Sequence, residues 1–215
     1  MERHVSMEEI SDGKLYGLGD MVRADCGGCE GCSTCCKGMG QSVVLDPLDF
    51  HRLCLGLKAE PKQVMAAAVD LHVEKGIIFL SLKMSGPEES CLFLNEEGRC
   101  RIHPFRPGFC RMFPLGRFYE EGGGFRYFLQ VHECPKEPKA KVKVKKWIDT
   151  PNVKEYEAFV NRWHDFLKKL ERALQEKNDP AWAKRANLRL LEEFYLKPYT
   201  QGEFYREFGE RCKIT

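Results

Sequence analysis

Apolar residues in the last third of the chain recur at intervals of three and four residues, the period of a helix that buries one face. They are Tyr156, Phe159, Val160, Trp163, Phe166, Leu167, Leu170 and Leu174. The pattern predicts a helix over 152–176, ended before the turn residues 178–180. It also predicts a helix over 181–196, with Leu188, Leu191 and Phe194 on one face, and a short one over 202–209.

Shorter apolar runs between residues 77 and 129 end at turn residues, as strands do. We expect strands at 77–82 and at 91–94, the latter turned at 95–98 into 99–102. A further hairpin is predicted around the three glycines 122–124. Its arms carry Phe118 and Tyr119 on one side and Phe125, Tyr127 and Leu129 on the other.

Two short helices are predicted before these strands. Asp46 followed by Pro47 is typical of a helix start, because the carboxylate caps the first turn and proline fits the first helical position. That helix would turn Phe50, Leu53 and Cys54 inward. A second helix begins near Pro61, and its predicted inward residues are Val64, Met65, Ala68 and Leu71.

The predicted elements describe an α+β fold: a small cysteine-rich metal-binding core with β-hairpins, followed by a C-terminal helical segment. At 215 residues the chain is long enough to bury its own core. We divide it into a weakly structured lead-in (1–24), a cysteine-cluster domain (25–138), and a basic connector with C-terminal helices packed on the core (139–215).

Composition limits the binding partners and the cellular compartment that we expect for this protein. The formal net charge of +2 gives no global attraction to nucleic acid or to a membrane. The first residues lack the apolar stretch of a secretory signal, so we expect a cytoplasmic protein. Lysines alternate with Ala140, Val142 and Val144, which predicts an edge strand whose charges block further pairing. The alternative is a docking stripe for an acidic partner or for nucleic acid. These lysines are Lys136, Lys139, Lys141, Lys143, Lys145 and Lys146.

Cysteine is the residue type that carries chemistry here. The chain has eleven, and the segment 26–36 alone holds Cys26, Cys29, Cys32, Cys35 and Cys36. Such a loop serves a zinc site, an iron–sulfur cluster or a disulfide knot. The odd count and a reducing compartment favour metal over disulfides. The spacing of Cys26, Cys29, Cys32 and Cys36 also fits a ferredoxin-like run, but Lys37 stands where that run has proline.

A second set of cysteines, Cys91, Cys100, Cys110 and Cys134, has wider spacing. Arginines lie beside it and would offset the negative charge of a thiolate-bound metal, Arg106 and Arg111 above all; the alternative is that they pair with surface carboxylates. His103 or His132 could complete a Cys₃His zinc site, although a hydrogen-bonded histidine is the more common case. We interpret Cys54 as a core residue and Cys212 as incidental.

These motifs resemble the YkgJ-type cysteine-cluster proteins, described as a zinc- or iron-chelating domain that flagellin lysine N-methylases also carry. The resemblance covers residues 26–135, including Arg106-Pro107 and Cys110-Arg111. It implies metal binding through eight thiolates, while Cys26 is extra to the pattern and His103 stands where tyrosine is usual. The eight are Cys29, Cys32, Cys35, Cys36, Cys91, Cys100, Cys110 and Cys134.

The sequence therefore predicts a metal-binding protein, with an iron–sulfur cluster, [4Fe–4S] for example, favoured over zinc. Adjacent Cys35 and Cys36 suit different metal atoms better than one tetrahedral ion. Two alternatives stay open: a zinc module that binds a protein partner, and a protein-lysine methyltransferase-like enzyme implied by the resemblance. No S-adenosylmethionine-binding loop is recognisable, and no catalytic residue stands out.

Overall fold

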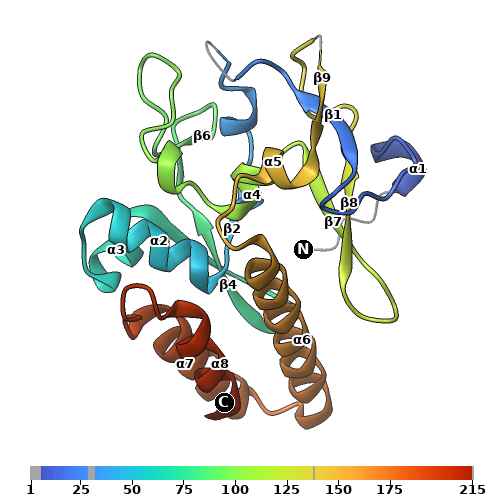
Figure 1. Ribbon diagram of the computed structural model, residues 1–215. Coiled ribbons are helices and arrows are strands. Elements are labelled where there is room, and N and C mark those ends of the chain that lie inside the picture. The colour runs from blue at the N-terminus through green and yellow to red at the C-terminus, as the bar shows by residue number, and fades with distance from the viewer. Residues whose placement is uncertain (1–5, 29–31, 138, 215) are drawn as a thin grey trace.

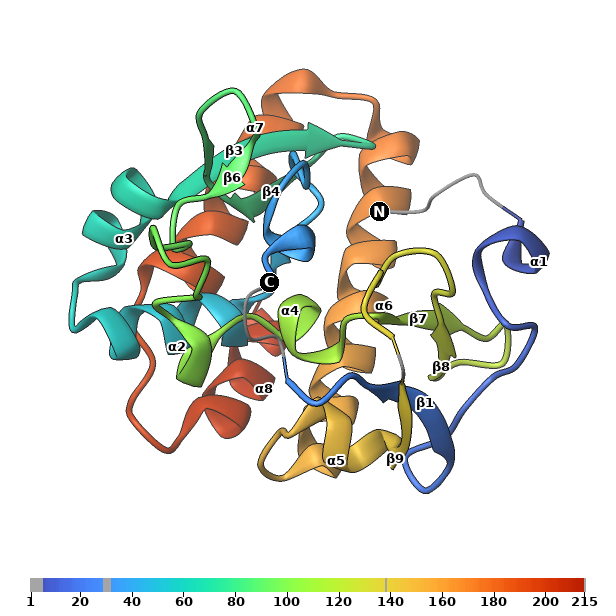
Figure 2. The same cartoon turned by 90° about the horizontal axis from the view of Figure 1, so that it is seen from above.

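A computed structural model of the protein describes residues 6–28, 32–137 and 139–214. Its small antiparallel sheets and C-terminal helices confirm the predicted α+β class. Buried side chains form two hydrophobic clusters. Figure 2 shows helix α6 (Val153–Lys177) between the two halves of the molecule that these clusters occupy.

The larger cluster is built on a three-stranded sheet. Strand β4 (Ile77–Leu82), predicted with these bounds, is central because its residues 80–82 are all buried. β2 (Val44–Leu45) and β3 (Val69–Glu74) flank it, both antiparallel to it. Helices α2 (Pro47–Leu57) and α3 (Pro61–Ala68) pack beside the sheet, as Figure 1 shows.

Both short helices begin where the sequence predicts. The Asp46 carboxylate accepts the Asp49 backbone N–H at 2.8 Å, and Glu60 with Gln63 forms a capping box before α3. Phe50 and Leu53 are buried as expected. The prediction for Leu71 is wrong, because α3 ends at Ala68 and the chain continues as β3, whose outer face carries Leu71 at 47% exposure.

The C-terminal helices confirm the prediction made from the helical period of the apolar residues. α6 is followed by α7 (Pro180–Leu191), the π-helical segment η3 (Glu192–Leu196) and α8 (Phe204–Ile214). Tyr156, Phe159, Val160 and Trp163 are buried on α6. The predicted inward face of α7 is wrong at Leu188, which is 55% exposed, because the helix buries Leu190, about 200° further round its axis.

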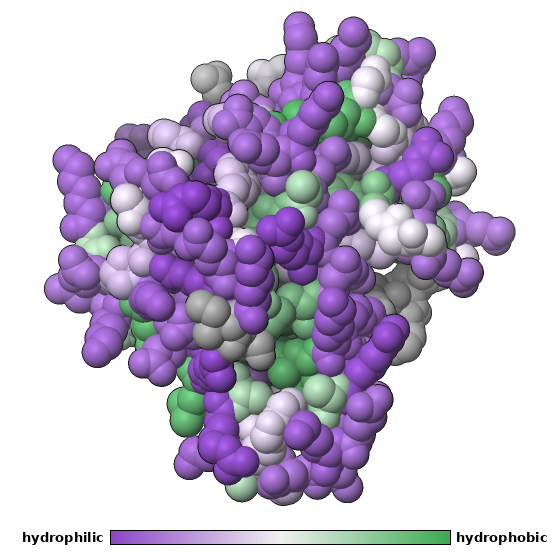
Figure 3. Space-filling view, turned by 60° about the horizontal axis from the view of Figure 1, so that its bottom comes forward, coloured by the Kyte–Doolittle hydropathy of each residue, from purple (hydrophilic) through white to green (hydrophobic). Residues whose placement is uncertain are grey.

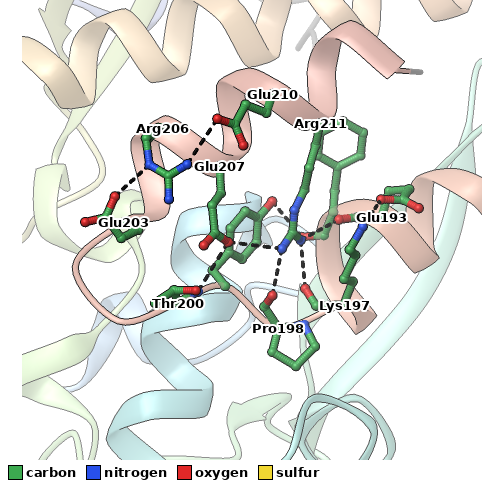
Figure 4. Close-up of polar contacts among 11 residues, drawn as sticks. Glu193, Lys197, Pro198, Thr200, Glu203, Arg206, Glu207, Glu210 and Arg211 are labelled. Atoms are coloured by element: carbon green, nitrogen blue, oxygen red, sulfur yellow. Dashed lines mark hydrogen bonds and ion pairs between the residues drawn. The ribbon is translucent and has the colours of Figure 1, made fainter.

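Arg211 fastens α8 to the end of η3. Its guanidinium donates to the carbonyl oxygens of Glu193 (2.6 Å), Lys197 (2.7 Å) and Pro198 (2.6 Å), and it lies over the Tyr199 ring. Figure 4 shows these carbonyls converging on the Arg211 side chain. The residue is 6% exposed, so a buried charge is satisfied by the carbonyls that the end of a helical segment leaves without partners.

The smaller cluster lies between two antiparallel ribbons and a short helix. The predicted glycine hairpin is β7 (Leu115–Tyr119) paired with β8 (Phe125–Leu129). The second ribbon joins β1 (Met21–Asp25) to β9 (Ala140–Lys143), and α5 (Val144–Ile148) follows it. β1 and a first helix, α1 (Met7–Ile10), lie in the segment expected to be weakly structured.

Two of the alternating lysines, Lys141 and Lys143, lie on strand β9 of this ribbon. Lys141 and Lys143 are exposed and stand opposite Arg23 and Met21 of β1, while Val142 is half-buried. Because β9 has only β1 as a partner strand within the described residues, the predicted edge strand is confirmed over 140–143. The prediction is wrong for Val144, Lys145 and Lys146, which lie in helix α5. Figure 3 shows one face of the molecule, on which hydrophilic side chains predominate and apolar ones form small patches. No helix of the described residues could span a membrane.

Gly108 stands at the contact between the cysteine-bearing loops and the helical core. Helix α4 (Gly108–Met112) begins there, and the Gly108 N–H donates to the Asp49 carboxylate at 2.7 Å. A methyl group at position 108 would overlap the Tyr156 hydroxyl and lie 3.5 Å from the Asp49 carboxylate.

We expect Gly108→Ala to lower the free energy of unfolding by about 1–3 kcal/mol, because α4 must shift away from α2 and α6. Urea denaturation followed by circular dichroism measures this. Gly122→Ala is the matched control, since a methyl group there meets nothing within 4 Å. Equal stability of the two variants would contradict the close packing at Gly108.

Candidate metal centre

Cys91 and Cys100 are brought together by a short hairpin. Cys91 ends β6 (Ser90–Cys91), which pairs with β5 (Met84–Ser85). Cys100 forms a bridge with Leu94, and the Arg101 N–H donates to the Phe93 carbonyl at 2.9 Å. The predicted strands at 91–94 and 99–102 are thus a turn with a single bridge, because β6 ends at Cys91. The hairpin nevertheless packs both cysteines against the larger cluster.

Cys35 and Cys36 reach the same place from the N-terminal loop. They form the 3₁₀ turn η1 (Thr34–Cys36), and the loop after it is tied to the turn before β6. The Gly38 N–H donates to the Glu88 and Glu89 carbonyls, and Lys37 pairs with the Glu88 carboxylate at 2.7 Å. Gly38 has a φ of +65°, which favours glycine at this close backbone contact.

Cys110 is delivered by α4, which two side chains hold in place. One is Asp49, through the Gly108 N–H. The other is Arg111, whose guanidinium donates to the carbonyls of Arg106 (3.1 Å), Pro104 (3.0 Å) and Asp149 (2.8 Å). The helix therefore presents the Cys110 thiol toward the hairpin thiols from a fixed position.

Five thiols gather as a result, and we call Cys35, Cys36, Cys91, Cys100 and Cys110 the five-thiol group. Burial raises the pKa of Cys110, and the charges of Cys91, Asp49, Cys35 and Cys100 raise it further. Burial also raises the pKa values of Cys91 and Cys100, each with a contribution from Cys35. The neutral thiols are thus favoured until a bound cation offsets the charge of the thiolates.

Cys35 differs from its neighbours. A hydrogen bond with the Cys36 thiol lowers the pKa of Cys35 to about 7, against the effect of burial, and Arg106 lowers it further. The same hydrogen bond and burial raise the pKa of Cys36. Since the thiolate is the metal-binding form, Cys35 is the thiol of this group that is most ready to bind near neutral pH.

Three further thiols form a separate group: Cys26, Cys32 and Cys134, the three-thiol group. Burial raises the pKa of Cys134, and the thiols that contribute after it are Cys26 and Cys32. The thiols that contribute most to the raised pKa of Cys110 are instead Cys91, Cys35 and Cys100. Cys29, the remaining predicted ligand, lies outside the described residues.

The predicted arginines differ in their surroundings. The guanidinium of Arg111 donates to backbone carbonyls, as described above. Arg106 instead lowers the pKa of both Cys35 and Cys100. Arg106 also donates to the His103 ring at 3.0 Å, and burial together with Arg106 lowers the pKa of that histidine. A role for Arg106 and Arg111 toward a bound metal stays a prediction, as does ligation by His103 or by the exposed His132.

The donor set suits a thiophilic metal. Thiolates bind zinc, and they bind the irons of iron–sulfur clusters. Within residues 6–28, 32–137 and 139–214, no three cysteine, histidine or carboxylate side chains yet converge as they would around a metal ion. Ligation therefore requires these thiol side chains to turn toward a common point, from loops that already lie together.

Cys54 and Cys212 lie outside both groups. Burial raises the pKa of each to about 11, and no other cysteine contributes to either shift. Cys54 lines a cavity of about 380 Å³ between α2 and η3, with His51 and Tyr199. Another cleft, of about 720 Å³, is lined by Arg52, Phe105 and Lys145 among others and contains none of the predicted cysteine ligands.

The comparison with protein families agrees with this cysteine arrangement. A family model, CxxCxxCC, "Putative zinc- or iron-chelating domain", matches residues 28–150, more than half of the chain. The chain belongs to the CxxCxxCC family. The matched segment contains both thiol groups except Cys26. No curated protein and no solved structure matched the chain.

Membership of the CxxCxxCC family confirms the suspected resemblance and the expectation of a zinc- or iron-chelating, cysteine-rich domain. Two features of this site do not follow from the sequence patterns. The family resemblance leaves Cys26 outside its eight cysteines, although Cys26 follows β1 directly and contributes to raising the pKa of Cys134. Asp49 was treated only as part of a helix start, although it anchors the helix that carries Cys110.

Asp49 also predicts a pH dependence of stability. It is 3% exposed, and burial together with the Asp46 carboxylate raises its pKa to about 8, against the lowering effects of the Gly108 N–H and of Arg117 and Arg52. Between the unfolded and folded pKa values, the unfolded chain is ionised at this position while the folded chain keeps the proton. Stability is therefore lost as pH rises through this window.

We expect metal-free wild-type protein to lose roughly 1–3 kcal/mol of stability between pH 5 and pH 7.5, and Asp49→Asn to show a clearly smaller loss. Asparagine keeps an oxygen for the Gly108 N–H. Urea denaturation at both pH values measures the difference, with the exposed Asp165→Asn as the control for removing one carboxylate. Parallel pH profiles of D49N and wild type would contradict the assignment.

Proposed function

We propose that the five-thiol group holds an iron–sulfur cluster and that the chain is a metal-cluster protein with a redox or metal-handling role. The supporting observation is the gathering of five thiols, two of them adjacent in sequence, where one tetrahedral zinc ion takes four ligands. Adjacent Cys35 and Cys36 can ligate different irons of one cluster, which a single zinc ion does not offer.

The charge around the group supports the same proposal. A four-thiolate iron–sulfur site carries net negative charge, and positive side chains that lie near the sulfurs offset it. Arg106 acts on two of the five thiols, since its charge lowers the pKa of both Cys35 and Cys100. A bound iron–sulfur cluster exchanges single electrons. The protein's part is to supply thiolates, first from Cys35 and then from thiols that release their protons on binding.

A structural zinc centre is the second candidate, because the family description names zinc beside iron. Four thiolates would then fill every position on the metal, and its binding energy would support the fold. The chain would act through its surface, as a module that docks on a protein partner.

Anaerobic purification followed by iron, zinc and sulfide analysis separates the two candidates. We expect a brown protein with iron and acid-labile sulfide in near-equal amounts. A colourless protein with tightly held zinc and no sulfide would contradict the iron–sulfur proposal and leave the zinc candidate.

Substitution of Cys110 tests which thiols hold the metal. We expect Cys110→Ser to lose most of the iron and sulfide, roughly tenfold or more relative to wild type. Cys54→Ser is the matched control, because Cys54 is also a half-buried helical cysteine but has no thiol neighbour among the groups that shift its pKa. Full cluster content in C110S, measured by metal analysis and the visible spectrum, would contradict the assignment of the five-thiol group.

A further inference from the structure

The three-thiol group lies at the end of the β1–β9 ribbon, where two distant segments meet. β1 and β9 are antiparallel, and Asp25 of β1 stands opposite Ala140 of β9. Cys26 follows Asp25 directly, and Lys139 precedes Ala140 directly. The Lys136 ammonium reaches the Gly28 carbonyl at 3.5 Å, across 108 positions of sequence. Segments 26–28 and 134–137 therefore lie side by side.

Each segment is folded tightly around its cysteine. The Gly27 N–H donates to the Asp25 carboxylate at 2.9 Å, and the Cys26 thiol lies 3.4 Å from the Gly28 carbonyl. Gly27 and Gly28 both have positive φ, so the chain turns back immediately after Cys26. On the other side, the Lys139 ammonium donates to the Cys134 carbonyl at 2.9 Å. Two thiols from distant segments are thus held at one end of a paired ribbon.

The local charge suits a thiolate-bound cation. Lys139 is 11% exposed at its side chain and lies over the Cys134 turn, where it also pairs with Glu137. Three thiolates around a divalent ion leave one net negative charge, and a half-enclosed ammonium offsets a charge of that size. Lys136, on the Gly28 carbonyl, adds a second positive charge to the same end of the ribbon.

We propose that Cys26, Cys32 and Cys134 bind a second thiophilic metal ion, of the zinc class, separate from the centre in the five-thiol group. The inference deepens the proposed function, because it rests on the cysteine loops being metal ligands. It adds Cys26 to the ligands and divides the described thiols between two centres. The proposal is built on these three described thiols alone.

The division of the thiols between two centres follows from the contacts between the loops that carry them. Cys35 and Cys36 are tied to the turn before Cys91 through Gly38, so they belong to the hairpin side. Cys26 and Cys134 are tied to the ribbon through Gly28 and Lys139. The Cys32 thiol lies 3.6 Å from the Thr34 hydroxyl, and Cys32 acts with Cys26 to raise the pKa of Cys134. Cysteines that are close together in the sequence thus lie beside two different parts of the fold: Cys26 beside the ribbon, and Cys35 and Cys36 beside the hairpin.

The test uses the full chain in four forms, each purified anaerobically for metal and sulfide analysis and then stripped and titrated with Co²⁺. The forms are wild type, Cys26→Ser with Cys134→Ser, Cys91→Ser with Cys100→Ser, and the control Cys54→Ser with Cys212→Ser. The Co²⁺–thiolate absorption counts the centres. We expect C26S/C134S to bind one equivalent fewer than wild type and to keep the metal of the five-thiol group. C91S/C100S should show the reverse, and the control should match wild type.

Two results overturn the inference. One is unchanged metal content and Co²⁺ stoichiometry in C26S/C134S. The other is loss of every metal in that variant, which would indicate one shared centre. Both leave the proposed function standing if C91S/C100S loses metal. Retention of all metal by C91S/C100S would instead contradict the proposed function. Because a double variant can fail to fold, single C26S, at the end of the ribbon, is measured beside it, with circular dichroism to establish that each form is folded.

Discussion

One buried carboxylate joins the cysteine loops to the helical core. Asp49 lies in the first turn of α2, is nearly inaccessible to solvent, and accepts the Gly108 N–H that begins α4. Because Tyr156 of α6 packs against the same glycine, three helices meet at this contact. The position of Cys110 depends on it, and so does the arrangement of the thiols that surround Cys110.

Electrostatics set the condition under which those thiols can act. Burial raises the pKa values of Cys91, Cys100 and Cys110, and the charges of neighbouring thiols raise them further. Cys35 is the exception, since its hydrogen bond with Cys36 favours the thiolate. A thiophilic cation removes the repulsion, so metal binding and the packing of these loops support each other. Membership of a zinc- or iron-chelating family agrees with this physical requirement.

Arginine serves two purposes in this fold, and only contacts distinguish them. Arg111 and Arg211 are both buried, and each guanidinium satisfies three backbone carbonyls at a place where helices end or loops cross. Arg106 instead acts on thiols, through its charge. Sequence proximity to cysteine marked Arg106 and Arg111 alike, because spacing along a chain does not tell which way a side chain turns.

The sequence by itself determined the local elements. The starts of α2 and α3, strand β4, the glycine hairpin and helix α6 were predicted because caps, turn residues and helical period depend on neighbours a few positions apart. The abundance of thiols likewise marked a metal-chelating domain. Tertiary structure alone decided that Leu71 and Leu188 are exposed and that Asp49 holds α4. These features depend on contacts between segments far apart, such as Gly28 with Lys136, which no local pattern encodes.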